Sequence, residues 1–466
     1  MKHRLSSLVA GLLLVGAALP ACNVGPNYER PQVATAASYR GQQIESEAAP
    51  AALAERGWWE LFEDQALQTL IRTALERNQD LRIAAARRLE AEALLGGARA
   101  EQLPTLSGQL SAQGSRSIAG PRAFDANGSF FAGLSASWEI DFWGKFRRAS
   151  ESAQADLLAT EWGRRATMQS LVAQVASAYF ILRALDQQLR IAEGALEARR
   201  ESLRLTLRRE QSGAGSLLDV HQAEELVQLA EGERVNLARR IEQHENLIAT
   251  LLGLDPRPIS RGQPLEAQAL PPEVPAGLPS ALLERRPDIR AAEQQLVSAN
   301  AQIGVARAQR FPSLSLTGSG GVVSGALLAL FTSPAVVLNA AGSLVQPLFD
   351  GGRLSAQESA AGARAQQAAL LYERTIVQAM REVSDALVGF RRNRELLVSR
   401  DALLEASRQA LSLVEARYQG GSSSYLEVLD ASSRRLEAEF ALVQTRLDAL
   451  LSYVDVYRAL GGGWQV

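Results

Sequence analysis

The sequence contains few of the residues on which redox, metal and catalytic sites depend. Its 466 residues include one cysteine, Cys22, and three histidines, His3, His221 and His244. A single cysteine excludes a disulfide framework and every metal site built from clustered cysteines. His3 lies in a leader sequence, and the other two lie in charged helical stretches that favour solvated side chains. Phosphate-loop, HExxH and GxSxG motifs are also absent, so we expect no catalytic residues, no metal and no cofactor.

An excess of charge of one sign is missing as well. Lys and Arg together number 49 and Asp and Glu 51, which gives a net charge of −2. Binding to nucleic acid depends on neutralising phosphates with basic side chains, so this balance argues against a nucleic-acid partner. Hydrophobic residues make up 47% and charged residues 21%, which is typical of a folded chain. The length allows about two to four domains, or one elongated body.

The first residues have the features of an export signal. Lys2 and Arg4 precede an apolar run at 5–19, and small residues follow it. This run of about 15 residues is shorter than the roughly 20 that a membrane-spanning helix requires. We therefore assign residues 1–21 to a signal peptide.

The only cysteine closes this leader. Leu19-Pro20-Ala21-Cys22 resembles a bacterial lipobox, in which the thiol is acylated and the cysteine becomes the first residue of a lipoprotein. Pro20 is not the usual residue there, and a free cysteine near an ordinary cleavage site is the alternative. Acylation of Cys22 would anchor the segment 22–64 to a membrane without spanning it.

Long hydrophobic runs are missing from the rest of the chain. The best remaining run, 326–338, is interrupted by Ser333-Pro334 and is too short for a membrane helix. Only helices and closed barrels span lipid. Any pore in this protein is therefore predicted to be a β-barrel.

The second half of the sequence repeats the first at a constant offset of 208 residues. Pro104 matches Pro312, and Gly253 matches Gly461. The shared spacing extends over most of each half, so each half should form one copy of the same unit. We predict a first repeat at 65–253, a Pro-rich connector at 254–280, a second repeat at 281–461 and a C-terminal tail at 462–466.

Each repeat begins with a predicted helix, at about 65–103 in the first, and continues with two predicted strands. Leu106 and Leu110 alternate with Ser107 and Gln109, and a second alternating run follows at 130–142. This period of two predicts membrane strands with one lipid-facing side and one wet side. The hairpins are expected at 105–142 and 313–348.

Turn and aromatic residues complete the predicted hairpin. Asn127-Gly128 lies between the two runs and suits a tight turn. Trp138, Phe142 and Trp143 gather at one strand end, as in an interfacial aromatic girdle. The alternation alone also fits the hairpin of a soluble β-sandwich.

Four strands per chain cannot close a barrel, because about eight are needed even for a filled one. An open sheet edge in lipid is not tolerated. The chain is therefore expected to be an oligomer that pools its strands. A dimer would supply eight strands and a trimer twelve.

Long helices follow the strands. The stretch 145–211 lacks proline and, as a helix of 67 residues, would reach roughly 100 Å. Its apolar residues recur at alternating spacings of three and four, which is a coiled-coil pattern. They are Leu171, Val175, Ala178, Leu182, Leu185, Leu189, Ala192, Leu196 and Leu203. A Gly/Ser-rich turn then reverses the chain, and Ser216 and Asp219 suit the start of the next helix. Helical hairpins are predicted at 145–253 and 353–460.

Four segments carry a family resemblance. They read CNVGPNYERP at 22–31, GWWELF at 57–62, RYQGG at 417–421 and SYLEVLDA at 424–431. Together they resemble the OprM/NodT-type outer-membrane efflux lipoproteins, which belong to the TolC-like outer-membrane factors.

The resemblance implies a mainly α fold with a membrane β part. It implies a homotrimer whose twelve strands form one outer-membrane β-barrel, continuous with a coiled-coil helical barrel in the periplasm. It also implies a passive channel of a tripartite efflux pump that exports drugs or other small solutes. The partners would be a periplasmic adaptor (membrane fusion protein) and an inner-membrane transporter of the resistance-nodulation-division type. The location would be the outer membrane, with a lipid anchor.

The resemblance also assigns residues at the helical tips. Glu427 and Asp430 match the acidic ring of the periplasmic constriction, and Tyr418 and Asp219 match residues that hold it closed by hydrogen bonding. Ser423 stands where some members have a basic partner. The tip turns that meet the adaptor correspond to Gly213, Ser216, Gly421 and Ser424. A simpler role for Glu427 and Asp430 is that of acids favoured in a helix first turn.

A function of another class stays open on the sequence alone. Lipid anchoring and heptad helices also fit a coiled-coil surface scaffold with soluble hairpins. Single-channel conductance distinguishes this scaffold from a channel.

Overall fold

The structure of the chain is a computed structural model that describes residues 23–33, 39–40, 57–116, 126–270, 282–332 and 334–464. The predicted signal peptide and Cys22 lie outside the described residues, as does part of the connector. The chain divides into two compact units. Unit 1 consists of the described residues within 1–32, 87–161 and 291–373, and unit 2 consists of all other described residues.

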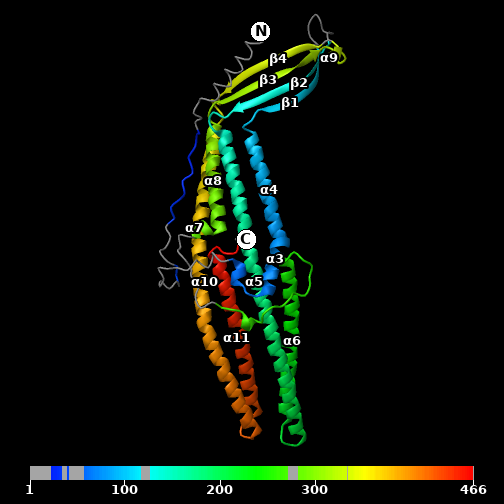
Figure 1. Cartoon of the computed structure of the whole chain (residues 1–466), viewed down its shortest axis with the longest axis vertical. Helices are drawn as coiled ribbons and strands as arrows, with labels where there is room; N and C mark the ends of the chain where they lie inside the picture. The colour runs from blue at the N-terminus through cyan, green and yellow to red at the C-terminus, as the bar shows by residue number, and fades with distance from the viewer. Residues whose placement is uncertain are drawn as a thin grey trace. The chain divides into compact units, whose positions relative to one another are not determined.

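Unit 1 contains one antiparallel sheet of four strands in the order β1-β2-β3-β4 (Figure 1). The strands are β1 (Thr105–Arg116), β2 (Ala126–Ile140), β3 (Ser313–Ser324) and β4 (Ala335–Val345). Each repeat supplies one hairpin, and β2 pairs with β3 to join the two hairpins. The short helix α9 (Ala329–Thr332) lies in the β3–β4 connection.

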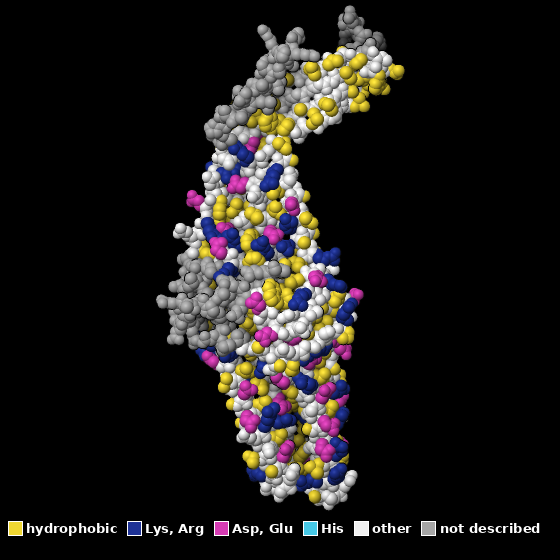
Figure 2. Space-filling model, viewed as in Figure 1, with side chains coloured by type: hydrophobic (Ala, Val, Ile, Leu, Met, Phe, Trp, Pro, Cys, Tyr) yellow, Lys and Arg dark blue, Asp and Glu magenta, His cyan; other side chains and the backbone are white. Residues whose placement is uncertain are grey.

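The strand register collects the apolar residues on one side of the sheet, the apolar face. Leu106 pairs with Ala136, and Leu134 with Gly320, which in turn pairs with Leu338. Leu106 is 72% exposed and Leu338 80% exposed. In Figure 2 the sheet shows hydrophobic side chains and few charged ones, whereas both signs of charge cover the helices. A soluble sandwich would cover such a face, but within the described chain it stays uncovered.

The opposite side, the polar face, carries hydroxyl and amide groups. The Oγ atoms of Ser107 and Ser135 lie 2.7 Å apart across β1 and β2. The Asn339 amide donates to Ser319 Oγ at 3.4 Å across β3 and β4. One sheet therefore has one water-compatible side and one lipid-compatible side, as the period of two predicted.

The predicted turn at Asn127-Gly128 is wrong. Both residues belong to β2, where Asn127 pairs with Ser115 and Gly128 with Gly114. The chain reverses between Arg116 and Ala126 instead. Continuing the ladder satisfies backbone groups that an early turn would leave unpaired, and this outweighs the local preference of the dipeptide.

The helical segments of unit 1 are joined by polar side chains. Their helices are α4 (Gln79–Ala100), α5 (Lys145–Gln211), α8 (Pro287–Ala308) and α10 (Arg353–Gln419). Arg88 of α4 pairs with Glu161 of α5 at 3.2 Å. The hydroxyls of Ser152 in α5 and Ser298 in α8 lie 2.9 Å apart. Arg307 of α8 pairs with a carboxylate of α10, so each helix is tied to the next.

Unit 2 contains the two helical hairpins, in which α5 reverses into α6 (Leu217–Leu251) and α10 into α11 (Tyr425–Ala459) (Figure 1). Shorter helices are α2 (Trp58–Leu61), α3 (Gln65–Arg77), η2 (Leu265–Ala267) and α7 (Leu282–Arg285). The predicted heptad positions of α5 are buried except Leu189 and Leu203, which are half-buried. Leu196 and Leu203 pack with Val227 and Ala230 of α6. The seam therefore holds the first hairpin together, as the spacing predicted.

Helix α5 also qualifies as a membrane helix by length and composition, which the sequence reading did not anticipate. The qualifying stretch is 78% buried inside the protein. A core helix passes the same test, because it too is rich in apolar residues. The heptad packing of α5 accounts for this composition.

The first predicted helix, at about 65–103, is in fact two helices separated at Asn78. The Asn78 carboxamide oxygen accepts from Leu81 N at 3.1 Å, which starts α4. Its nitrogen donates to Leu251 O at 2.9 Å, at the end of α6. An asparagine within a helical pattern can thus stop one helix and start another when a distant carbonyl receives its amide.

The duplication at offset 208 is confirmed by the backbone. Adding 208 to the bounds of α4, β1, α5 and α6 gives the bounds of α8, β3, α10 and α11 in every case. The two repeats therefore share these three helices and their first strand, whereas the bounds of β2 and β4 differ.

Candidate functional site

The two tip turns have the same backbone. Gly213 follows α5 with φ +75°, and Gly421 follows α10 with φ +76°. Ala214 N donates to Arg209 O at 2.8 Å, and Ser422 N donates to Arg417 O at 2.9 Å. These bonds satisfy carbonyls at the helix ends, as glycine C-caps do.

Both second helices begin with a capping box. Ser216 caps α6 and bonds reciprocally with Asp219, while Ser424 caps α11 and bonds reciprocally with Glu427. Ser423 adds a hydrogen bond from its hydroxyl to Glu427 Oε2 at 2.7 Å. This bond is the main cause that lowers the pKa of Glu427. The Ser423 hydroxyl therefore stabilises the ionised form of Glu427.

The second predicted gate carboxylate lies one helical turn further on. Asp430 is exposed and pairs with Arg434 at 3.0 Å. Glu427 is also exposed, and residues three apart share a helix face. The structure thus places both acids on one solvent-facing side of α11, where exposed ion pairs contribute little to stability.

Tyr418 and Asp219 belong to different hairpins. The guanidinium of Arg209 lies 4.6 Å from the centre of the Tyr418 ring. Burial raises the pKa of Tyr418, Arg209 lowers it, and the Asp219 charge raises it. Asp219 accepts from Ser216 N at 3.2 Å, and among the described residues no hydrogen bond joins it to Tyr418. The contact that joins Tyr418 to the first hairpin is therefore the one with Arg209.

A further tie between the hairpins was missed by the sequence reading. The hydroxyls of Ser202 in α5 and Tyr425 in α11 lie 2.9 Å apart. Tyr425 also lies 5.7 Å from Tyr418, centre to centre. The available signal was that Tyr425 replaces Leu217 of the first repeat. Together with the Arg209–Tyr418 contact, this bond holds the two hairpins together near their tips.

His244 differs from the expectation of a solvated side chain. It is half-buried, and its Nε2 lies 2.9 Å from Ala178 O. Burial lowers its pKa. His221 is exposed and pairs with Glu224, as expected. Within the described residues no cluster of ligands suits a metal ion.

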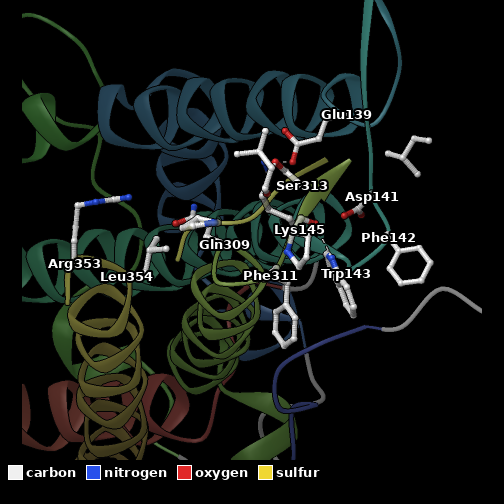
Figure 3. Close-up of a pocket in the computed structure, with 15 residues that line it drawn as sticks. Glu139, Asp141, Phe142, Trp143, Lys145, Gln309, Phe311, Ser313, Arg353 and Leu354 are labelled. Carbon is white, nitrogen blue, oxygen red and sulfur yellow. Dashed lines mark hydrogen bonds and ion pairs between the residues drawn. The ribbon is translucent and has the colours of Figure 1, made fainter. Parts of the chain in front are cut away.

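A cavity of about 360 Å³ lies in unit 1 where the strands meet the helices (Figure 3). Lys145 pairs with Glu139 at 2.6 Å at its edge. Trp143 stacks on Phe311 at 4.6 Å, and its indole NH donates to Pro312 O at 2.8 Å. These contacts hold the strand ends against the starts of the helices at the cavity.

The N-terminal segment that carries the family resemblance is seated on the same unit. Val24 N donates to Trp143 O at 3.1 Å. Arg148 donates to Asn27 Oδ1 at 2.7 Å. Arg30 pairs with buried Glu293 at 2.8 Å. The chain that follows Cys22 is therefore fixed beside the base of the sheet.

Comparison with known proteins gives a consistent result over nearly the whole chain. The outer membrane efflux protein family model matches residues 70–254 and 278–462, which are themselves 208 residues apart. The solvent efflux pump outer membrane protein SrpC of Pseudomonas putida is 37% identical over 100% of this chain and 99% of its own. The cation efflux system protein CusC of Escherichia coli is 34% identical over 97% and 98%.

Solved structures agree. The open state of the MtrE outer membrane channel of Neisseria gonorrhoeae has a TM-score of 0.85 at 34% identity, covering 95% of this chain and 99% of that one. The CmeC outer membrane channel of Campylobacter jejuni has a TM-score of 0.89 at 26% identity, covering 95% of both chains. The chain is a member of the outer membrane efflux protein family, an outer-membrane component of an efflux system.

Proposed function

We propose that three copies of this chain form a passive outer-membrane channel. The observation that carries the proposal is the four-stranded sheet with one apolar and one polar face. Its outer strands, β1 and β4, each have an edge without a partner among the described residues. Open edges are not tolerated in lipid, so copies must join edge to edge. Three copies supply twelve strands and a wet lumen, whereas the eight strands of a dimer enclose space for little more than side chains.

The channel would act as the outer section of a tripartite pump without catalysis of its own. Its partners would be a periplasmic adaptor and an inner-membrane transporter of the resistance-nodulation-division type. The similar relatives are named for solvent, toluene, antibiotic and cation efflux. Such different cargoes on one fold favour substrate choice by the partners, with the channel as a shared path for small solutes.

We place the periplasmic gate at the tips of the hairpins. Glu427 and Asp430 are exposed on one side of α11, so three copies would present six carboxylates. Tyr418 and Asp219, with the Ser202–Tyr425 bond, would hold the hairpins in the closed arrangement. The turns at Gly213, Ser216, Gly421 and Ser424 would meet the adaptor, because they are the outermost reversals of both hairpins.

We also propose a lipid anchor at Cys22. The lipobox carries this proposal, and the hydrogen-bonded seat of Val24 and Asn27 beside the sheet supports it. A lipid on Cys22, two residues before Val24, would then reach the membrane that the strands are proposed to span. Metabolic labelling with an acyl precursor should mark the wild type and not Cys22→Ser. Label that persists in the variant would show that the lipid is attached to another residue.

Single-channel recording in planar bilayers tests the channel. The purified oligomer should give discrete conductance steps that disappear when it is heated to monomers. A stable oligomer that inserts without conductance would instead favour the lipid-anchored scaffold. Cross-linking mass measurement checks the trimer separately, because a dimer would contradict the twelve-strand barrel.

A further inference from the structure

The polar face of the sheet changes character toward the β1–β2 connection. From the helices outward it carries Ser135 in β2 and Ser319 in β3, which pair with each other. Phe131 lies four residues before Ser135 and therefore on the same face. Its cross-strand partners are Ser111 and Val323. An aromatic ring thus interrupts a row of hydroxyl groups.

Two glycines form a seat for this ring. Gly133 and Gly321 are paired across β2 and β3. A Cβ on Gly133 would lie 2.6 Å from Phe131 Cζ, and one on Gly321 would lie 2.8 Å from Phe131 Cε2. Any larger residue at either position would collide with the ring and also with backbone atoms of the paired strand. The ring of Phe131 therefore lies over two positions where the sheet has no side chains.

Neighbouring side chains extend the apolar zone. Val337 pairs with Gly321 and is the one half-buried position of β4. Val323 is also half-buried. Phe131, Val323 and Val337 therefore form an apolar cluster on a face that is polar nearer the helices.

We propose that this cluster, repeated in each copy, forms an apolar collar around the lumen at which aromatic solutes, and aromatic cations above all, bind in transit. The inference rests on the proposed trimeric channel, which turns the polar face inward. Phe131 is the specificity-determining residue of the collar. An apolar zone in an aqueous path offers apolar solutes a surface that hydrated ions do not favour. Aromatic ring faces also attract a poorly hydrated cation.

The orientation of Phe131 can be tested with its own neighbour, since Phe130 lies on the apolar face by alternation. Phe131→Cys and Phe130→Cys are treated in lipid vesicles with a charged methanethiosulfonate, with the wild type as background. Phe131→Cys should react at least about tenfold faster, because the charged reagent is excluded from lipid. The opposite order would overturn the collar, since Phe131 would then face lipid.

The binding test compares two cations of equal charge in single-channel recordings. Tetraphenylphosphonium is aromatic and tetraethylammonium is not. Phe131→Leu keeps apolar bulk and should weaken block by tetraphenylphosphonium about fivefold, while block by tetraethylammonium is unchanged. Phe130→Leu should change neither. Acidic residues elsewhere in the channel attract both cations equally. A change in block by tetraphenylphosphonium alone therefore reports the contribution of the Phe131 ring.

The outcomes separate this inference from the channel on which it rests. Unchanged tetraphenylphosphonium block in Phe131→Leu, with normal conductance, would overturn the collar and leave the channel intact. Absence of conductance in the wild type, together with an unreactive Ser107→Cys on the polar face, would overturn the channel itself.

Discussion

The two repeats share a backbone but divide the chemistry unequally. Asn78 and Arg286 are equivalent at offset 208, and both interrupt the helical run before α4 and α8. Asn78 donates to Leu251 O and Arg286 to Ala459 O, which are also equivalent carbonyls. The first repeat makes this contact with a neutral amide and the second with a buried cation. Duplication thus preserved a contact between helix ends while the side chain that makes it changed.

The tips differ in the same way. Asp219 and Glu427 are equivalent capping residues, but Asp430 stands where the first repeat has Gln222. The two helix starts therefore differ in where their acids lie. Asp430 has no acidic counterpart in the first repeat, so it is the residue that tests whether the proposed gate depends on the second hairpin.

One polar centre belongs to neither repeat alone. Buried Asp64 precedes α3 and accepts hydrogen bonds from the Tyr179 hydroxyl at 2.7 Å, Gln263 N at 2.8 Å and the Gln268 amide at 2.8 Å. Gln263 and Gln268 lie in the connector. One carboxylate therefore receives three of the hydrogen bonds that fix the link between repeats to the first repeat.

The largest effect should come from Arg286. Arg286→Ala leaves Glu382 and Asp288 without the cation that pairs with them at 2.8 and 2.6 Å. We expect a loss of about 3–5 kcal/mol in unfolding free energy, measured by guanidinium unfolding followed by circular dichroism. Arg286→Asn, which copies the first repeat, should not restore it. Arg392→Ala, at an exposed ion pair, is the control, and an equal loss there would contradict the argument.

Asp64→Asn should cost about 2–3 kcal/mol, because an amide cannot accept from all the same donors. Burial alone would raise the pKa of Asp64, but the bonds from Tyr179, Gln268, Gln263 and Ala66 lower it below its usual value. A lowered pKa means that the stabilisation is present above the unfolded value of about 3.9 and is lost as pH falls through the folded value.

The pH test follows the unfolding midpoint from neutral to acid. The wild type should lose stability below about pH 4 more steeply than Asp64→Asn. Glu63→Gln changes an exposed neighbouring carboxylate and should keep the wild-type slope. If the unfolding midpoints of all three proteins fell in parallel with pH, Asp64 would not contribute to the loss of stability in acid.

Asn78→Ala should cost about 1–2 kcal/mol, less than its counterpart in the second repeat, because it leaves no buried charge. Asn78→Asp keeps the acceptor for Leu81 N but sets a buried carboxylate oxygen against Leu251 O, and should cost more than the alanine variant at neutral pH. Glu76→Ala on the exposed side of α3 is the control. If Asn78→Ala cost as much as Arg286→Ala, the two contacts would be energetically equivalent after all.

The smallest effect concerns charge at the tip. Glu427→Gln with Asp430→Asn removes the acids while keeping their shape, and should raise conductance and weaken block by cobalt hexammine by about two- to fivefold. Gln222→Asp should strengthen block if the first hairpin also lines the constriction. Conductance and block that match the wild type in the double variant would place the constriction elsewhere.

Local periodicity made much of the fold predictable. The period of two in 105–114 and the heptad spacing of Leu171, Val175 and Leu182 each depend on one element meeting one environment. The offset of 208 then doubled every element that was recognised once. The turns at Gly213 and Gly421 and the cap at Ser216 followed from turn chemistry that acts within five residues, whereas the reciprocal bonds of the two capping boxes came from the structure.

The sequence by itself determined which segments are strands, which are paired helices, and that they occur twice. The tertiary structure decided the pairing of β2 with β3, the break at Asn78 and the Ser202–Tyr425 bond. Each of these joins residues from separate elements, Asn78 and Leu251 being 173 positions apart. No local preference encodes such a contact, because its energy exists only after packing has brought the two groups together.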